Sequence, residues 1–350
     1  MCGIVAYLGK KPAQPILVEG LKRLEYRGYD SAGVAILSSG KIRITKCSGR
    51  ISALEEILPA PRPDETVGIG HTRWATHGAP NTINAHPHPD FSGKIAVVHN
   101  GIIENFTTLK TWLISEGCKF ASETDTEVIS NLIGYFYNNI DNCHGRQPSD
   151  GQNRFEWAVQ RTLNELHGTY GLAILCSDCP DTLIGAKKGS PLILGVGENE
   201  YVLASDAAAI VAHTTQAIYL ADNEMVTITS EGFRTKTIDN VIVSKEVKQI
   251  EFSLEQIELG GFKHYMLKEI FEQPNALTTC MGGRLDIRNN RVVLGGIASH
   301  SRELTRTKRI ILTGCGTAWH ACLEASFYLN SLREFQPRRN MQANSGIAIQ

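Results

Sequence analysis

Short runs of apolar residues bounded by glycine-containing turns fill the first part of the chain, a pattern typical of β-strands. Five runs are expected to be strands before the first long helix: 3–9, 32–37, 42–47, 67–72 and 95–98. Six more are expected after it: 171–176, 182–187, 192–196, 201–204, 218–221 and 225–229. Because the strands are grouped and do not alternate strictly with helices, they predict two stacked, largely antiparallel sheets with helices outside.

A helix is expected between the two groups of strands. Its apolar residues recur at steps of three and four, the period of a helix with one buried face: Val128, Ile129, Leu132, Ile133 and Phe136. Segment 122–127 supplies the Ser, Thr, Asp and Glu residues that suit a helix N-terminus. A second helix is expected over 155–166.

The pattern changes near residue 244, where a mixed-charge segment ends in a pair of glycines at 260–261. Such a segment is typical of a connection between domains. We interpret 244–265 as a linker between a first domain, residues 1–243, and a second, residues 266–350.

The second domain has a different pattern. A buried strand at 309–312, a glycine turn at 313–317 and a helix at 318–332 indicate α/β architecture. Residues from about 333 to 350 are polar and lack periodicity. We expect this last stretch to be disordered.

Composition favours small-molecule chemistry. The 350 residues exceed the usual size of one domain, and the 35 basic and 36 acidic residues nearly cancel. Charge therefore gives no reason to expect nucleic acid or an anionic membrane as partner. No run approaches the roughly 20 apolar residues of a membrane span. Nine scattered cysteines suit a reducing compartment, so a cytoplasmic location is expected.

Two motifs could suggest metal binding. The string His-Pro-His-Pro at 86–89 lacks a cysteine or carboxylate set at ligand spacing, and its prolines speak against a metal site. Cys176 and Cys179 form a CxxC motif without a second pair at the spacing of a zinc site. We expect ordinary structural cysteines, no metal and no cofactor.

Cys2 directly follows the initiator methionine, and removal of Met1 would place a thiol and a free α-amine on one residue. The thiolate is the attacking species, and an α-amine titrates near pH 7.7–8.0 and can carry the proton. Taken alone, the position is weak evidence, because most cysteines near a terminus have no catalytic role.

Five strings, the first of which contains Cys2, make the position of this cysteine meaningful. They are Cys-Gly-Ile-Val at 2–5, Glu-Tyr-Arg-Gly-Tyr-Asp-Ser-Ala-Gly at 25–33, His-Thr-Arg-Trp-Ala-Thr-His-Gly at 71–78, His-Asn-Gly-Ile-Ile-Glu-Asn at 99–105 and Glu-Thr-Asp-Thr-Glu at 123–127. This set resembles the glutaminase domain of the glutamine–fructose-6-phosphate aminotransferases (isomerizing). The resemblance extends to Lys-His-Tyr-Met-Leu-Lys-Glu-Ile-Phe-Glu-Gln-Pro at 263–274 and Cys-Gly-Thr at 315–317.

The resemblance implies an α+β fold: a four-layer αββα N-terminal nucleophile hydrolase domain of the class II glutamine amidotransferases, followed by the start of an α/β sugar-isomerase domain. It implies hydrolysis of L-glutamine to glutamate and ammonia. In the family, which is expected to be homodimeric at full length, ammonia converts fructose 6-phosphate to glucosamine 6-phosphate. Amidophosphoribosyltransferase and asparagine synthetase share the N-terminal cysteine but not both the 71–78 and 263–274 strings.

By resemblance, Cys2 attacks the amide of glutamine to form a γ-glutamyl thioester. Asn100 and Gly101 match the oxyanion donors, through the asparagine amide and the glycine N–H. An Asn-Gly pair is also typical of a tight hairpin turn. We expect a turn after the strand at 95–98, aiming both donors.

Four residues match the family's contacts with the rest of glutamine. Arg73 corresponds to the group that binds the α-carboxylate, with Thr76 and His77 nearby, and Asp125 corresponds to the acceptor for the α-ammonium. In isolation, an arginine and an aspartate are more often a surface pair or a helix cap.

Two residues are expected to support the site. Trp74 lies in a string resembling the mobile loop that closes over glutamine, with a core tryptophan as the alternative. Arg27 resembles the family's arginine beside the nucleophile, with a structural ion pair to Asp30 as the alternative.

The second domain is expected to be the truncated N-terminal part of a sugar isomerase. Thr317 matches a sugar-site threonine at a strand-to-helix turn, where a helix N-terminus suits a phosphate. The family's phosphate loop and later acid/base residues are not found before Gln350, so the synthase half is expected to be incomplete. The alternative from another class is a catalytically inactive glutamine-binding or regulatory remnant.

Overall fold

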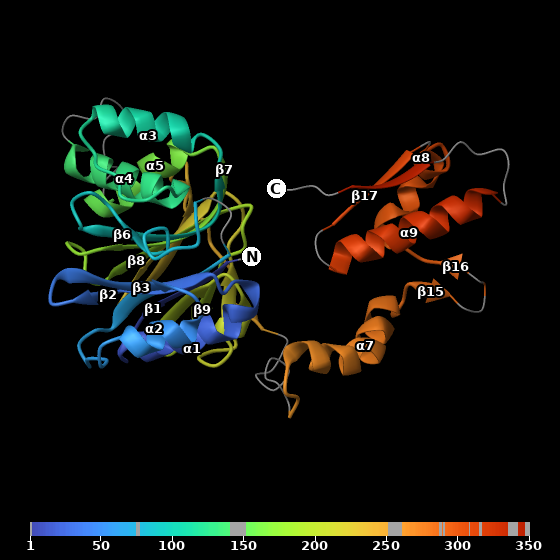
Figure 1. The fold of residues 1–350 in the computed structure, drawn as a ribbon, viewed down its shortest axis with the longest axis horizontal. Coiled ribbons are helices and arrows are strands. Elements are labelled where there is room, and N and C mark those ends of the chain that lie inside the picture. The colour runs from blue at the N-terminus through green and yellow to red at the C-terminus, as the bar shows by residue number, and fades with distance from the viewer. Residues whose placement is uncertain are drawn as a thin grey trace. The chain divides into compact units, whose positions relative to one another are not determined.

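The computed structural model describes residues 2–74, 78–140, 152–250, 261–286, 289, 291–307, 309–314, 317–334 and 342–346. The chain divides into two compact units, Met1–Gly260 and Gly261–Gln350 (Figure 1). Among the described residues, no helix combines the length and apolar character that crossing a membrane requires.

An eight-stranded sheet carries the N-terminus of the first unit, in the order β14-β11-β9-β10-β1-β4-β2-β3. Its strands are β1 (Gly3–Leu8), β2 (Ser31–Ser38), β3 (Lys41–Ser48), β4 (Val67–Arg73), β9 (Ile193–Val196), β10 (Tyr201–Ala204), β11 (Gln216–Tyr219) and β14 (Lys248–Gln249). Every pairing is antiparallel. Strand β14 lies within the segment predicted to be a linker.

A six-stranded antiparallel sheet has the order β13-β12-β8-β7-β6-β5. Its strands are β5 (His88–Pro89), β6 (Ile95–Ile103), β7 (Gly168–Cys176), β8 (Thr182–Lys188), β12 (Glu224–Thr229) and β13 (Gly232–Thr237). Strand β6 pairs with β7 over its whole length and with the two residues of β5 on its other side.

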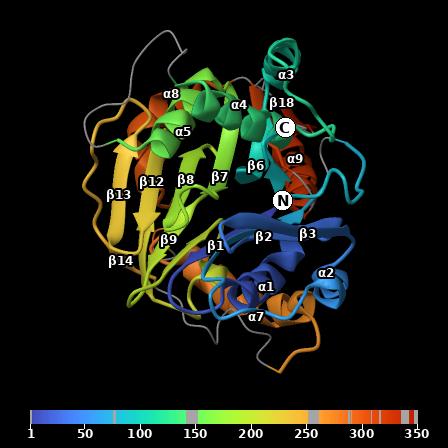
Figure 2. The ribbon, with the colours of Figure 1, turned by 90° about the vertical axis from the view of Figure 1, so that its left-hand side faces the viewer.

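Three apolar cores hold the sheets and helices in four layers (Figures 1 and 2). Between the sheets, β1 residues Ile4 and Ala6 pack with β6 residues Ala96 and Val98. On the outer faces, α1 (Ala13–Leu24) and α2 (Ile51–Ile57) cover the eight-stranded sheet, while α4 (Asp125–Asn138) and α5 (Arg154–Glu165) cover the other, with α3 (Phe106–Ser115) beside α4. Alternate residues of β1 enter two cores because side chains alternate across a strand.

Most predicted elements are confirmed, with shifted ends. The helix expected from the Val128 periodicity is α4, and Thr124 caps it by accepting a hydrogen bond from the N–H of Glu127. The tight Asn-Gly turn is wrong: Asn100 and Gly101 lie inside β6, opposite Gly171 and Tyr170 of β7. The extended pairing with β7 outweighs the local turn preference of the dipeptide.

The second unit contains α7 (Tyr265–Met281), a hairpin of β15 (Leu285–Asp286) and β16 (Arg291–Val292), α8 (Ser301–Thr305), β17 (Arg309–Thr313), α9 (Thr317–Glu334) and β18 (Gln342–Gly346). Strand β18 pairs in parallel with β17. The expectation of disorder after residue 333 is therefore wrong for 342–346, while 335–341 and 347–350 lie outside the described residues.

Candidate active site

Cys2 immediately precedes β1, at the end of a central strand of the eight-stranded sheet. The antiparallel register pairs Gly3 with Thr72, so the end of β4 lies beside Cys2. The backbone N–H of Trp74 donates a hydrogen bond of 3.2 Å to Sγ of Cys2. The strand register therefore brings the strings at 2–5 and 71–78 together.

The Cys2 thiol is held mainly in its protonated form. Burial raises its pKa, and this effect outweighs the hydrogen bond from Trp74 and the positive charges of the N-terminus and Arg73, which lower it. Attack by sulfur therefore requires a base that removes the thiol proton.

Asn100 reaches Cys2 from the other sheet. Its Nδ2 donates a 3.1 Å hydrogen bond to the Cys2 carbonyl oxygen, which leaves the second proton of this amide nitrogen for another acceptor. Its Oδ1 lies 2.9 Å from Nε2 of His71. The two sheets therefore meet at the nucleophile through the asparagine side chain.

Gly101 occupies a position that only glycine fits. Its φ of +135° lies in a region that other residues rarely adopt. A Cβ there would stand 2.2 Å from the carbonyl oxygen of Thr169 on β7. The backbone next to Asn100 is thus fixed by close approach to the neighbouring strand.

Arg73 and Asp125 are both buried, and Arg73 interacts electrostatically with the Cys2 thiol and with Asp125. Burial lowers the pKa of Arg73, against the attraction of the Cys2 thiolate, Asp125 and Asp30. Asp125 begins α4, and its Oδ2 accepts a 2.9 Å hydrogen bond from the N–H of Ile103. A buried cation beside the cysteine therefore interacts with a carboxylate that is fixed at the start of α4.

The two residues expected to support the site, Trp74 and Arg27, have different surroundings. Trp74 is 45% exposed and packs edge-to-face on Tyr29, so the alternative of a core tryptophan is excluded. Arg27 forms an ion pair with Asp206 and donates to Tyr26. Thr76 and His77 lie outside the described residues.

The sequence did not predict that three histidines form a buried cluster next to Asn100. The rings of His71 and His86 lie 4.3 Å apart, and those of His86 and His88 lie 4.8 Å apart. Thr126 on α4 is 2.6 Å from Nε2 of His86, and Thr124 is 3.0 Å from Nε2 of His88. His71 belongs to the 71–78 string, but sequence alone does not reveal its contact with another sheet.

Other sequence candidates lie apart from this site. Thr317 is the first residue of α9 in the second unit. The N–H of Cys179 donates to the carbonyl of Cys176 in the turn after β7. Within the described residues, no group of three or more His, Cys, Asp or Glu side chains could hold a metal ion.

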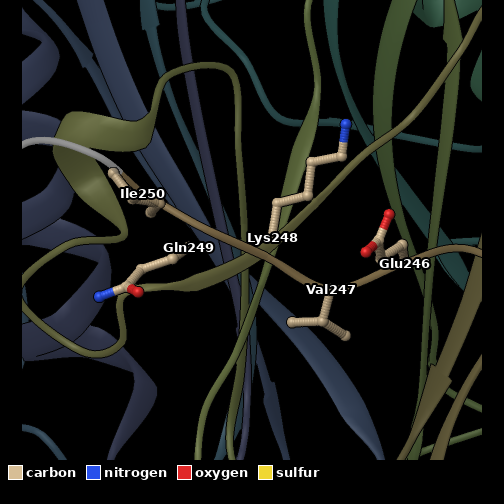
Figure 3. Close-up of a pocket in the computed structure, with 5 residues that line it drawn as sticks. All are labelled: Glu246, Val247, Lys248, Gln249 and Ile250. Atoms are coloured by element: carbon tan, nitrogen blue, oxygen red, sulfur yellow. The ribbon is translucent and has the colours of Figure 1, made fainter.

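A separate hollow of about 650 Å³ lies along β14 (Figure 3). Its described lining is five consecutive residues: Glu246, Val247, Lys248, Gln249 and Ile250. Their side chains point in different directions from one extended segment. This hollow therefore lacks the convergent polar groups typical of a ligand site.

Sequence comparisons point to the same region. A family model described as glutamine amidotransferase domain matches residues 82–212, which include Asn100, Gly101 and Asp125. Glutamine–fructose-6-phosphate aminotransferases (isomerizing) are 48% identical in Chlorobaculum tepidum over 94% of this chain, and 47% identical in Bacteroides thetaiotaomicron over 95%. The chain spans about half the length of these curated relatives, 52% in both.

Structural comparison supports the fold. Glutamine phosphoribosylpyrophosphate amidotransferase from B. subtilis superposes with a TM-score of 0.54 and 26% identity, covering 69% of this chain and 50% of that one. The structure described as the allosteric regulatory enzyme of purine biosynthesis gives the same score and identity over 68% and 49%. Together with the two antiparallel sheets, this likeness confirms the predicted α+β fold of the class II amidotransferases.

Proposed function

We propose that this chain hydrolyses L-glutamine through a thioester on Cys2. The chain is a homologue of the glutamine–fructose-6-phosphate aminotransferases over about half of their length, and it carries a glutamine amidotransferase domain. The observation that carries the proposal is the 3.1 Å contact between the Asn100 amide and the Cys2 backbone, with buried Arg73 interacting with both the Cys2 thiol and Asp125. This arrangement supplies a nucleophile, an amide donor and two opposite charges at one place.

In the first half-reaction, Sγ of Cys2 bonds to the side-chain amide carbon of glutamine and the C–N bond breaks. The thiol proton passes through the α-amine of Cys2, freed by removal of Met1, to the leaving nitrogen, which departs as ammonia. Water then attacks the thioester, releasing glutamate and restoring the thiol. Because burial raises the pKa of the thiol, attack requires a base, and the α-amine on the same residue would be that base.

During both attacks, negative charge develops on the substrate's carbonyl oxygen. We assign its stabilisation to the free N–H of the Asn100 amide and the backbone N–H of Gly101. Both groups belong to β6, whose pairing with β7 holds them in place before substrate arrives. Such fixed donors need no reorganisation during the reaction.

Recognition of free glutamine is assigned to two buried charges. Arg73 would bind the α-carboxylate with two parallel hydrogen bonds, and Asp125 would accept from the α-ammonium. Thr76 and His77 would add contacts near Arg73. Glutamine within a peptide would be rejected, because its amine and carboxyl are already amides.

Arg73→Lys is expected to raise KM for glutamine about tenfold with little change in kcat, because lysine keeps the charge but loses the paired hydrogen bonds. The matched control is Arg43→Lys. Arg43 lies on β3, which two strands separate from β1, and it donates two hydrogen bonds to Glu65. Initial rates over a glutamine series measure both constants. Equal KM values in the Arg73 and Arg43 variants would contradict the assignment.

We assign roles to the supporting residues and to the second unit from the likeness of this chain to its relatives. Trp74 would shield the thioester as part of a closing loop, and Arg27 would steady the segment beside Cys2 through its pair with Asp206. Thr317, at the N-terminus of α9, would contact the phosphate of fructose 6-phosphate. The ammonia would serve glucosamine 6-phosphate formation, in a cytoplasmic homodimer.

The test is release of glutamate and ammonia by chain shown by intact mass to lack Met1, compared with Cys2→Ala. We expect glutamate from the unmodified chain and only background from the variant. Parallel reactions with fructose 6-phosphate are assayed for glucosamine 6-phosphate, which separates hydrolysis from amino-sugar synthesis. Glutamine binding without glutamate release would overturn the proposal in favour of a non-catalytic binding protein.

A further inference from the structure

His71 and Asn100 form a hydrogen bond that joins the two sheets directly behind the nucleophile. His71 lies on β4 of the eight-stranded sheet, opposite Ile4 of β1, and Asn100 lies on β6 of the six-stranded sheet. Nε2 of His71 is 2.9 Å from Oδ1 of Asn100, and both side chains are buried. The bond therefore sets the position of a donor carried by the opposite sheet.

The chemistry of the two groups fixes the direction of this bond. An amide oxygen only accepts, so Nε2 of His71 must carry a proton and donate it. The opposite end of the amide donates through Nδ2 to the Cys2 carbonyl. Turning the amide over would set its oxygen against the Cys2 carbonyl oxygen, and would also require the imidazole to carry its proton on Nδ1 and not on Nε2.

The imidazole is suited to this task because it stays neutral. Complete burial lowers the pKa of His71 to about 3, although its hydrogen bond to Asn100 acts in the other direction. A neutral ring has a single N–H, which is committed to Asn100. Its Nδ1 is buried and makes no close hydrogen bond among the described groups, although the backbone of His99 also acts to raise the pKa of the ring.

Packing holds the ring plane. His86 lies against His71 with ring centroids 4.3 Å apart, and His86 is itself fixed by the 2.6 Å contact with Thr126 of α4. The imidazole thus has one orientation available for its donor. Helix α4 also begins with Asp125, so the same helix supports both the ring stack and the carboxylate.

We propose that His71 is a positioning residue for the oxyanion donor: its Nε2–H holds the Asn100 amide with the NH₂ group directed at the Cys2 side. This inference rests on the proposed glutaminase function and deepens it. His71 touches neither the reacting sulfur nor the substrate in this account, and acts through Asn100. It should therefore affect turnover more than binding of glutamine.

Two amide replacements separate this role from simple packing. In His71→Gln, the side-chain nitrogen comes near the place of Nε2 and can donate to Asn100. In His71→Asn, the shorter amide places its nitrogen near the position of Nδ1, which does not face Asn100. We expect His71→Gln to keep most of the turnover and His71→Asn and His71→Phe to lose about tenfold to a hundredfold in kcat.

The experiment measures kcat and KM for glutamine hydrolysis in the full chain lacking Met1, with thermal unfolding of each variant. The expected result is a kcat loss in the Asn and Phe variants, KM within about threefold of the unmodified chain, and rescue by Gln. Equal kcat in all three folded variants, or equal losses in Gln and Asn, would overturn the proposal. Absence of hydrolysis by the unmodified chain would instead contradict the proposed function.

Discussion

Asn100→Ala is expected to lower kcat for glutamine hydrolysis by about 10²–10³-fold, the effect typical of removing one oxyanion donor. The amide Nδ2 is held 3.1 Å from the Cys2 carbonyl, so its second proton is available where charge develops on the substrate. Because Arg73 and Asp125 bind the other end of glutamine in this account, KM should change much less. Initial-rate measurements on chain lacking Met1 give both constants.

The matched control for this change is Asn105→Ala. Asn105 also uses its amide in two backbone hydrogen bonds, donating to Glu165 and accepting from His167, but it lies beyond the end of β6. It should retain kcat within about twofold and lose only stability, on the order of 1 kcal/mol. Similar losses of turnover in both variants would mean that Asn100 acts through folding and not at the oxyanion.

Acid is expected to unfold the first unit well above the pH at which carboxylates protonate. Burial lowers the pKa of His71 to about 3, and burial lowers the pKa values of His86 and His88 well below their usual range. An unfolded histidine titrates near 6.5, so below this pH the unfolded chain binds more protons than the folded one. The free energy of unfolding must then fall as pH falls.

The size of the acid effect follows from the number of buried rings. Each contributes up to about 1.4 kcal/mol per pH unit, so the three together approach roughly 4 kcal/mol per unit below pH 6.5. Urea unfolding followed by circular dichroism between pH 7 and 5 measures this slope. His88→Gln should reduce it by about one third, because one of the three buried rings is removed. A flat pH dependence in the unmodified chain would contradict the burial of neutral histidines.

Sequence patterns predicted the sheets well because buried strands have a strong apolar signal. The apolar runs near Val5, Val34 and Ile174 predicted strands that the structure contains. Strands β5 and β14 have two residues each, which is too short for the alternation of apolar and polar residues that indicates a strand. Strand β6 was cut short because an Asn-Gly pair has a local turn preference, and only pairing with β7 reveals its extended course.

Some residues of the candidate site were predictable from the sequence and others were not. Cys2, Arg73, Asn100 and Asp125 were predicted from their strings, and strand register explains why separated strings meet. The contact of His71 with Asn100 joins residues 29 positions apart on different sheets, so no local pattern could indicate it. Its neutral state likewise depends on burial by surrounding layers, which is a property of the fold and not of the string.

The covalent intermediate on Cys2 tests the central claim most directly. Chain lacking Met1 is mixed with glutamine, quenched in acid within the first turnovers, and its N-terminal peptide is examined by mass spectrometry, with Cys2→Ser and Met1-retaining chain in parallel. We expect one γ-glutamyl group on Cys2 of the processed chain alone, lost on treatment with hydroxylamine as a thioester is. Glutamate release at the same rate with no acyl group on Cys2, or undiminished release by Cys2→Ser, would contradict the account.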